Sequence, residues 1–167
     1  MTELPLQDKI FYFLRHGEFS LNTGGLTDRG AEVSGLVARL IYADAQTAKI
    51  ATIATSRAPR AILTAAIVAH KFDLQPIELM SKLGYMAGTI DAVEPLGFET
   101  EPWVNFLSSI ISPAILVTHR RTMETAQFMA LPLISNVNIT DTIAADRGNT
   151  CFKIDAAGIH LIYPIKS

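Results

Sequence analysis

The sequence predicts a single α/β domain over residues 1–167, a three-layer sandwich with a mostly parallel central sheet and helices on both faces. Three observations lead to this prediction. Short apolar runs alternate along the chain with segments of helical period. Apolar residues make up 49% of the chain and charged residues 18%, which supports a buried core and excludes intrinsic disorder. The length of 167 residues is that of one ordinary domain.

Two strand–helix pairs are expected in the first part of the chain. Residues 10–14 are a continuous apolar run, which is typical of a strand buried on both faces. Thr27 can cap the helix that follows. The apolar positions of this helix recur at helical spacing, at Val33, Leu36, Val37, Leu40 and Ile41. Residues 50–55 predict a second strand, and the largely apolar segment 61–72 predicts a helix buried on most sides, with Ser56 as a candidate cap.

The middle of the chain predicts a short strand at residues 76–80 and then a long loop over residues 84–100, where glycine and proline recur. Loops of this length in compact domains often carry function. A helix is expected over residues 103–111, after Pro102.

The C-terminal part predicts one more buried strand, a helix and a hairpin. Residues 114–118 are a second continuous apolar run, and residues 121–129 have a helical pattern. Residues 150–154 and 159–163 are weaker strand candidates, joined by a turn over residues 155–158.

Composition excludes several classes of partner and site. The net charge is −2 and no basic run exceeds Arg120-Arg121, so no nucleic-acid partner is expected. A single cysteine, Cys151, excludes an intrachain disulfide and a cysteine-rich zinc site. The first five residues lack the pattern of a signal peptide, and the longest uncharged run, residues 103–118, is too short and too polar to span a membrane. We therefore expect a cytoplasmic protein with no membrane partner.

Polar residues follow three of the predicted strands. Arg15 and His16 end the first strand, Arg60 follows the second by a few residues, and His119 ends the strand over residues 114–118. Ligands of open α/β sheets bind outside the carboxyl ends of the strands. If these strands are neighbours, the two arginines and two histidines meet in one cleft.

Two arginines and two histidines without matching carboxylates predict a phosphate site. The guanidinium fork fits phosphate oxygens, whereas a metal ion, the competing interpretation of paired histidines, would be repelled by the arginines. A neutral imidazole among cations is also a nucleophile that can attack phosphorus.

These residues lie within motifs that resemble those of the histidine phosphatase superfamily, the phosphoglycerate-mutase-like proteins. Residues 13–18, Phe-Leu-Arg-His-Gly-Glu, resemble its signature, and Asn22 stands where one branch has an asparagine that contacts phosphate. Residues 26–30 resemble its Leu-Thr-x-x-Gly helix start, and residues 56–65 its Ser-x-x-x-Arg-Ala-x-x-Thr-Ala segment. Residues 117–119, Val-Thr-His, resemble its second histidine strand.

The resemblance implies a phosphoglycerate-mutase-like fold and a phosphatase without a cofactor. It implies His16 as the nucleophile, which forms a phosphohistidine intermediate, and Arg15 and Arg60 as phosphate clamps. His119 would be a further phosphate donor, and Asn22 would bind substrate.

The chain departs from the family at the general acid. Ser81 stands where the mutases carry a catalytic glutamate, and Arg120 stands where the acid-phosphatase branch has an aspartate. Glu78, Asp91 and Glu94 are nearby carboxylates without motif support. In this respect, and in lacking the insertions of the mutases, the chain resembles the compact phosphohistidine phosphatases.

Several interpretations stay open at this point. The substrate is a phosphorylated small molecule or a phosphohistidine protein, and a mutase activity is less favoured. A phosphate-binding scaffold that has lost turnover is the alternative from another functional class. Glu18 either orients the His16 loop or acts as an acid.

Overall fold

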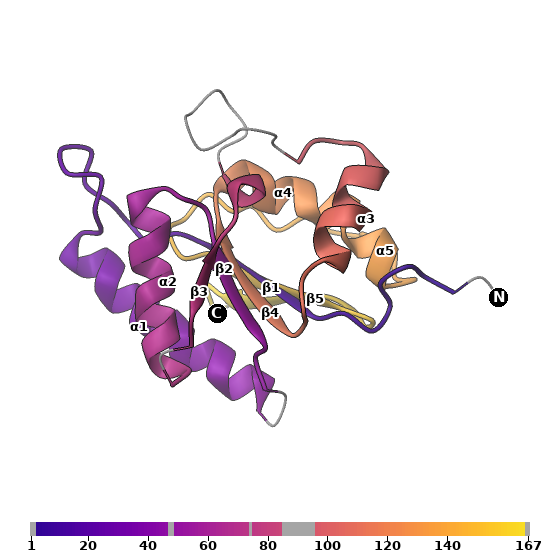
Figure 1. Ribbon diagram of the computed structural model, residues 1–167, viewed down its shortest axis with the longest axis horizontal. Coiled ribbons are helices and arrows are strands. Elements are labelled where there is room, and N and C mark those ends of the chain that lie inside the picture. Colours follow the sequence, from indigo (N-terminus) through magenta and orange to yellow (C-terminus); the bar gives the residue numbers. More distant parts are fainter. Residues whose placement is uncertain (1–2, 47–48, 74, 85–95, 166–167) are drawn as a thin grey trace.

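Strands and helices alternate along most of the chain in the computed structural model, which describes residues 3–46, 49–73, 75–84 and 96–165 (Figure 1). The strands are β1 (Phe11–Arg15), β2 (Thr52–Thr55), β3 (Ile77–Leu79), β4 (Ala114–Thr118), β5 (Cys151–Asp155) and β6 (Gly158–Tyr163). The helices are α1 (Asp28–Ala45), α2 (Pro59–Lys71), α3 (Thr100–Ser108), α4 (Arg120–Met129) and α5 (Leu131–Ile134), with a 3-10 turn, η1, at Ser81–Leu83.

The strands form one sheet in the order β3-β2-β4-β1-β5-β6. The four strands from β3 to β1 are mutually parallel, β5 is antiparallel to β1, and β6 is antiparallel to β5. The predicted mostly parallel sheet is therefore confirmed. In the register of the central pair, Arg15 lies opposite Thr118, so β1 and β4 end side by side.

Helices cover both faces of the sheet, because the buried strands alternate their side chains between two cores. Phe11 and Phe13 of β1 pack with α3, α4 and α5, whereas Tyr12 and Leu14 pack with α1 and α2. Figure 1 shows α1 and α2 on one side of the strands and α3 to α5 on the other. This confirms the three-layer sandwich.

Some elements differ from those the sequence predicts. Helix α3 begins at Thr100, ahead of Pro102, because a proline is tolerated in the first turn, where backbone N–H groups lack helical partners. Helix α2 is buried along one face rather than on most sides, because Leu63, Ala66 and His70 form an exposed stripe at helical spacing. Helix α5 was not predicted. Most of the predicted loop, residues 85–95, lies outside the described residues.

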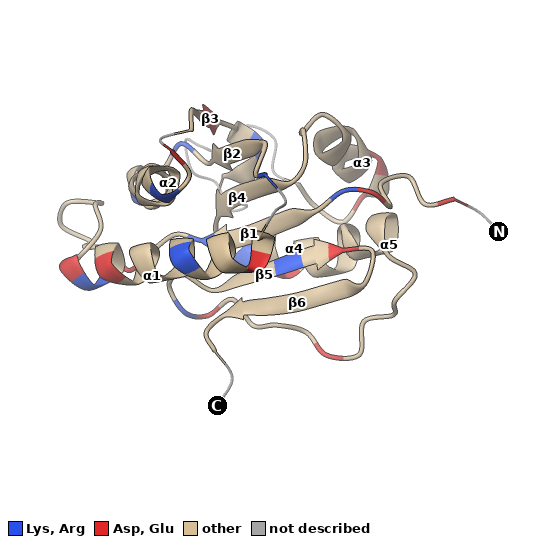
Figure 2. Cartoon of the chain, turned by 90° about the horizontal axis from the view of Figure 1, so that it is seen from below, with Lys and Arg blue, Asp and Glu red and all other residues tan. Residues whose placement is uncertain are grey.

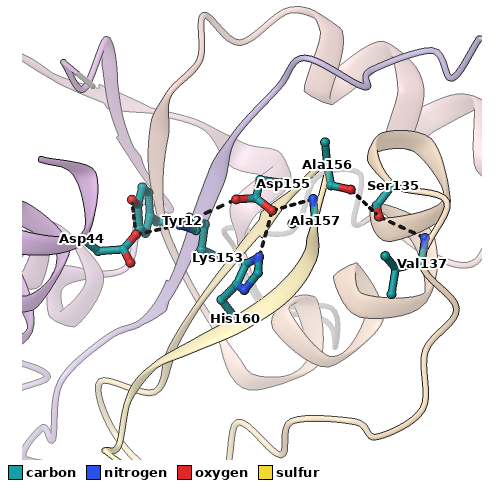
Figure 3. Close-up of polar contacts among 9 residues, drawn as sticks. All are labelled: Tyr12, Asp44, Ser135, Val137, Lys153, Asp155, Ala156, Ala157 and His160. Atoms are coloured by element: carbon teal, nitrogen blue, oxygen red, sulfur yellow. Dashed lines mark hydrogen bonds and ion pairs between the residues drawn. The ribbon is translucent and has the colours of Figure 1, made fainter. Parts of the chain in front are cut away.

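A chain of polar contacts links the end of α1 to β1, β5 and β6 (Figure 3). The Tyr12 hydroxyl donates to Asp44 Oδ2 at 2.6 Å, and Lys153 Nζ donates to the same oxygen at 2.9 Å. Lys153 also pairs with Asp155 Oδ2 at 3.6 Å, and Asp155 Oδ1 contacts His160 Nε2 at 2.8 Å. Burial and the Asp44 carboxylate raise the pKa of Tyr12. The contacts hold the long helix against the antiparallel strands.

Lys, Arg, Asp and Glu are absent from β2, β4 and β6, whereas β1, β3 and β5 each contain at least one of them (Figure 2). Within the described ranges, no helix combines the length and the apolar character that a membrane crossing requires.

Candidate active site

The two predicted histidines meet at the carboxyl ends of β1 and β4. His16 directly follows β1 and His119 directly follows β4, and the backbone N–H of His16 donates to Thr118 O at 3.1 Å. The two imidazole centroids are 5.1 Å apart. Both residues are buried, with 3% and 2% of their surfaces exposed. The strand register therefore places two imidazoles, far apart in sequence, in contact.

Hydrogen bonding fixes the tautomer of His16. Its Nδ1 lies 3.0 Å from the carbonyl oxygen of Gly17, which can only accept, so Nδ1 carries the proton and Nε2 keeps a lone pair. Burial lowers the pKa of His16 to about 4; the Gly17 contact opposes this shift, and the charges of Arg60 and Arg15 reinforce it. The ring is therefore neutral at neutral pH.

His119 is held by a serine that the sequence suggested for another role. Its Nε2 lies 2.8 Å from Ser56 Oγ, in the loop between β2 and α2. The predicted cap at Ser56 is wrong, because Ala58 precedes the first helical residue, Pro59, and the Ser56 hydroxyl contacts the imidazole instead. Burial, the nearby His16 and the two arginines lower the pKa of His119 to about 3.

Arg60 reaches His16 from the first turn of α2. Its Nε–H donates to His16 Nε2 at 3.3 Å, the nitrogen that holds the lone pair. The guanidinium carbon of Arg60 lies 4.7 Å from the ring centroid of Phe19, and the same ring meets the His16 imidazole edge-on at 5.3 Å.

Arg15 is the last residue of β1 and is half-buried. Its Nη1 donates to the carbonyl oxygen of Ala145 at 2.8 Å. The positive charge of Arg15 lowers the pKa of both His16 and His119, so Arg15 interacts electrostatically with both imidazoles.

Asn22 lies apart from the other predicted residues. It is exposed, in the turn between the bridged residues Phe19 and Leu26, and its backbone N–H donates to Ser20 Oγ at 3.2 Å. Within the described part of the chain, the Asn22 amide forms no hydrogen bond with His16. The structure thus brings four of the five predicted residues together and leaves Asn22 at the loop tip.

The His16 loop is held by residues that the sequence analysis did not single out. The Gly17 N–H donates to Thr64 Oγ1 at 2.9 Å, and the Asn149 N–H donates to His16 O at 3.1 Å. The buried Asn149 amide in turn donates to Ser34 Oγ at 2.9 Å. Thr64 lies within the motif over residues 56–65, but no sequence pattern points to Asn149.

Glycine allows the start of α1 to approach this loop. A Cβ on Gly30 would lie 2.2 Å from Glu18 O, so only glycine fits there. The Glu18 carboxylate accepts from Thr27 Oγ1 at 2.8 Å, and Thr27 caps α1. These contacts support the orienting role of Glu18 over that of an acid.

The described carboxylates do not identify a general acid. Glu78 is exposed on β3, and Asp91 and Glu94 lie outside the described residues. Among the described residues, the charged groups that shift the pKa of His16 are Arg60 and Arg15, both cations. No cluster of three or more His, Cys, Asp or Glu side chains within these ranges could hold a metal ion.

No protein-family model matches the chain, and no curated protein matches it by sequence. Solved structures do share its fold. A protein assigned as the phosphohistidine phosphatase SixA from Agrobacterium tumefaciens is 19% identical with a TM-score of 0.59, over 95% of this chain and 98% of that one. Phosphoglycerate mutase from Plasmodium falciparum is 17% identical with a TM-score of 0.58, over 95% and 96%. A mycobacterial glucosyl-3-phosphoglycerate phosphatase in complex with VO3 is 17% identical with a TM-score of 0.57, over 92% and 96%. The predicted phosphoglycerate-mutase-like fold is thereby confirmed.

Proposed function

We propose that the chain is a phosphatase of the histidine phosphatase superfamily, which transfers a phosphoryl group to His16 and then to water. The observation that carries the proposal is the state of the His16 imidazole. It is buried and neutral, and its Nε2 lone pair faces the Arg60 guanidinium beside a second imidazole. A nucleophile surrounded by fixed cations suits a phosphate dianion. The fold shared with known phosphatases supports the same function.

The reaction would proceed in two displacements. His16 Nε2 attacks phosphorus, an N–P bond forms, and the bond from phosphorus to the leaving group breaks with its electron pair on the leaving group. Arg15, Arg60 and the N-terminus of α4 would stabilise charge on the equatorial oxygens. Water then attacks phosphorus, the N–P bond breaks, and inorganic phosphate leaves as the imidazole is restored. This scheme uses no metal or organic cofactor.

The intermediate provides the direct test. Enzyme quenched during turnover of a labelled phosphomonoester should carry acid-labile, base-stable phosphate on His16. His16→Ala should abolish the label and turnover, whereas His70→Ala, an exposed histidine near the far end of α2, should keep both. Label on a serine would refute the mechanism.

Two substrate classes fit the site, a phosphohistidine protein and a small phosphoester. They differ in the leaving group, because an alkoxide needs a proton donor, and general acid catalysis contributes roughly 10²–10⁴-fold. Turnover of phosphoramidate should be compared with that of an alkyl phosphate in Asp91→Asn and Glu94→Gln. If either residue is the acid, its variant should slow the ester and spare the phosphoramidate. If neither changes the ratio and phosphoramidate is preferred, the phosphohistidine substrate is favoured.

A phosphate-binding scaffold is the second candidate. It is favoured by the all-cationic charge around His16 among the described residues. Vanadate binding without turnover of either substrate class would support the scaffold over the phosphatase.

A further inference from the structure

Phe19 contacts both the proposed nucleophile and the proposed phosphate clamp. Its ring and the His16 imidazole form a T-shaped pair, with the ring centroids 5.3 Å apart and the planes at 78°. On the same ring, the Arg60 guanidinium carbon lies 4.7 Å from the centroid. The two groups proposed to act on phosphate therefore share one aromatic neighbour.

We propose that Phe19 is a positioning residue that keeps the Arg60 guanidinium oriented toward the His16 imidazole. This inference rests on the proposed function of the site, and it adds a residue to which neither the motifs nor the comparisons give a role.

The contact with Arg60 is of the kind that orients a flexible side chain. A guanidinium within about 6 Å of a ring centroid is attracted by the negative face of the ring, and more strongly where water is excluded. The Arg60 backbone is fixed, because its carbonyl accepts from Thr64 Oγ1 at 2.8 Å in the first turn of α2. The side chain nevertheless has several rotatable bonds, and the ring limits the orientations of the group at its end.

Phe19 itself stands on a braced segment. It is bridged to Leu26, and the next residue, Ser20, donates its N–H to Gly25 O at 2.9 Å. Because a phenylalanine has only two side-chain torsions, a ring on such a support loses little further freedom when Arg60 packs on it. The half-buried ring thus offers a fixed surface beside His16 and Arg60.

A packing role alone would predict something different. Leucine would fill much of the same space but lacks the aromatic quadrupole, whereas tyrosine keeps the ring face. The two substitutions therefore separate apolar bulk from the interaction with the guanidinium.

A double-mutant cycle on vanadate binding tests the proposal. We expect Phe19→Leu to weaken vanadate binding about tenfold and to lower kcat by a similar factor, whereas Phe19→Tyr restores both to near wild type. In an Arg60→Ala background, Phe19→Leu should cause no further loss. Equal effects of Phe19→Leu in both backgrounds, or no effect in the wild type, would overturn the proposal.

The matched control is Phe72→Leu. Phe72 is also half-buried and also contacts a ring, that of Tyr42 at 5.7 Å, but it follows the far end of α2. It should leave vanadate affinity unchanged, and thermal melting should show all variants folded.

The two levels of inference fail separately. Suppose that the wild type binds vanadate, that the double-mutant cycle shows the expected coupling, and that no phosphomonoester or phosphoramidate is hydrolysed. The proposed phosphatase activity would then be overturned, and the role of Phe19 would stand. Hydrolysis of substrate together with fully additive effects of Phe19→Leu and Arg60→Ala would overturn the role of Phe19 and leave the phosphatase activity standing. A wild type that does not bind vanadate would overturn both.

Discussion

At the scale of single residues, the contacts of Arg60 are directed at the site. Its guanidinium meets His16 and Phe19, while its backbone lies in a regular helical turn. We expect Arg60→Ala to lower kcat by about 10²–10³-fold through lost stabilisation of phosphate charge. The free energy of unfolding should change by less than about 1 kcal/mol. Steady-state kinetics and urea denaturation without phosphate measure the two effects, and a large loss of stability would contradict the assignment.

The two imidazoles predict a pH dependence of stability. Burial lowers the pKa of His16 to about 4 and of His119 to about 3, against about 6.5 in the unfolded chain. Between these values the unfolded chain binds protons that the folded site does not, so this stability is present above about pH 6.5 and is lost as the pH falls toward 4. Urea denaturation at about pH 7 and pH 4.5 should show the loss.

Substitutions of single histidines show whether the loss of stability at low pH comes from the site. His119→Gln should reduce the difference in unfolding free energy between the two pH values, and His70→Gln, at an exposed position, should not. The same pKa values predict that kcat/KM, calculated on the concentration of the substrate dianion, declines only below about pH 5. A decline centred near pH 6.5 would show that His16 titrates as a solvated histidine.

At the scale of elements, the approach of α1 to the His16 loop depends on Gly30. A Cβ there would lie 2.2 Å from the Glu18 carbonyl oxygen, a backbone atom that cannot move alone. We expect Gly30→Ala to destabilise the protein by about 2–4 kcal/mol and to lower turnover as the loop shifts. Gly35→Ala is the matched control in the same helix, because its Cβ would meet only the end of Arg39 at 3.9 Å. Gly35→Ala should raise the free energy of unfolding by up to about 1 kcal/mol. Chemical denaturation of both variants measures the difference between them.

The strands that carry the site could be predicted from sequence, because their apolar runs are continuous and end abruptly at charged or histidine residues. The run over residues 114–118 matches β4 from end to end. Helix α3 was predicted three residues late, since Pro102 resembles a boundary although a first turn accepts it. Helix α5 is a single turn and is too short for periodicity to reveal.

The supports of the site could not be predicted in the same way. Asn149 donates its N–H to His16 O across a separation in sequence that only the β1–β5 pairing closes. Nothing in the sequence distinguishes Phe19 from other apolar residues in loops. Its contact with Arg60 depends on where the tertiary structure places the guanidinium. Asn22 matched the motif, yet it lies exposed in its turn. Motifs therefore identified residues that lie together in the candidate site, whereas the residues that hold them depend on the tertiary structure.

At the scale of the whole molecule, Asp44 joins the layer of α1 and α2 to the antiparallel strands. Its carboxylate accepts from Tyr12 and Lys153, which would both lose a partner in Asp44→Ala (Figure 3). We expect this change to destabilise the protein by about 1–3 kcal/mol. It should leave kcat unchanged, because Asp44 lies at the end of α1 opposite to Gly30. Glu32→Ala, at an exposed acidic residue beyond the first turn of α1, controls for lost charge. Thermal melting and turnover of the two variants measure both outcomes.

The placement of His16 and His119 directly after two adjacent inner strands has a consequence for amide hydrogen exchange. The N–H of His16 is bound to Thr118 O, and that of Ser56 to Val117 O, so these protons exchange only when the centre of the sheet separates. We expect both amides to be protected to nearly the same degree as those within β4, and far more than the β6 edge. The backbone that carries the two imidazoles would then stay intact through the local fluctuations that open the β6 edge.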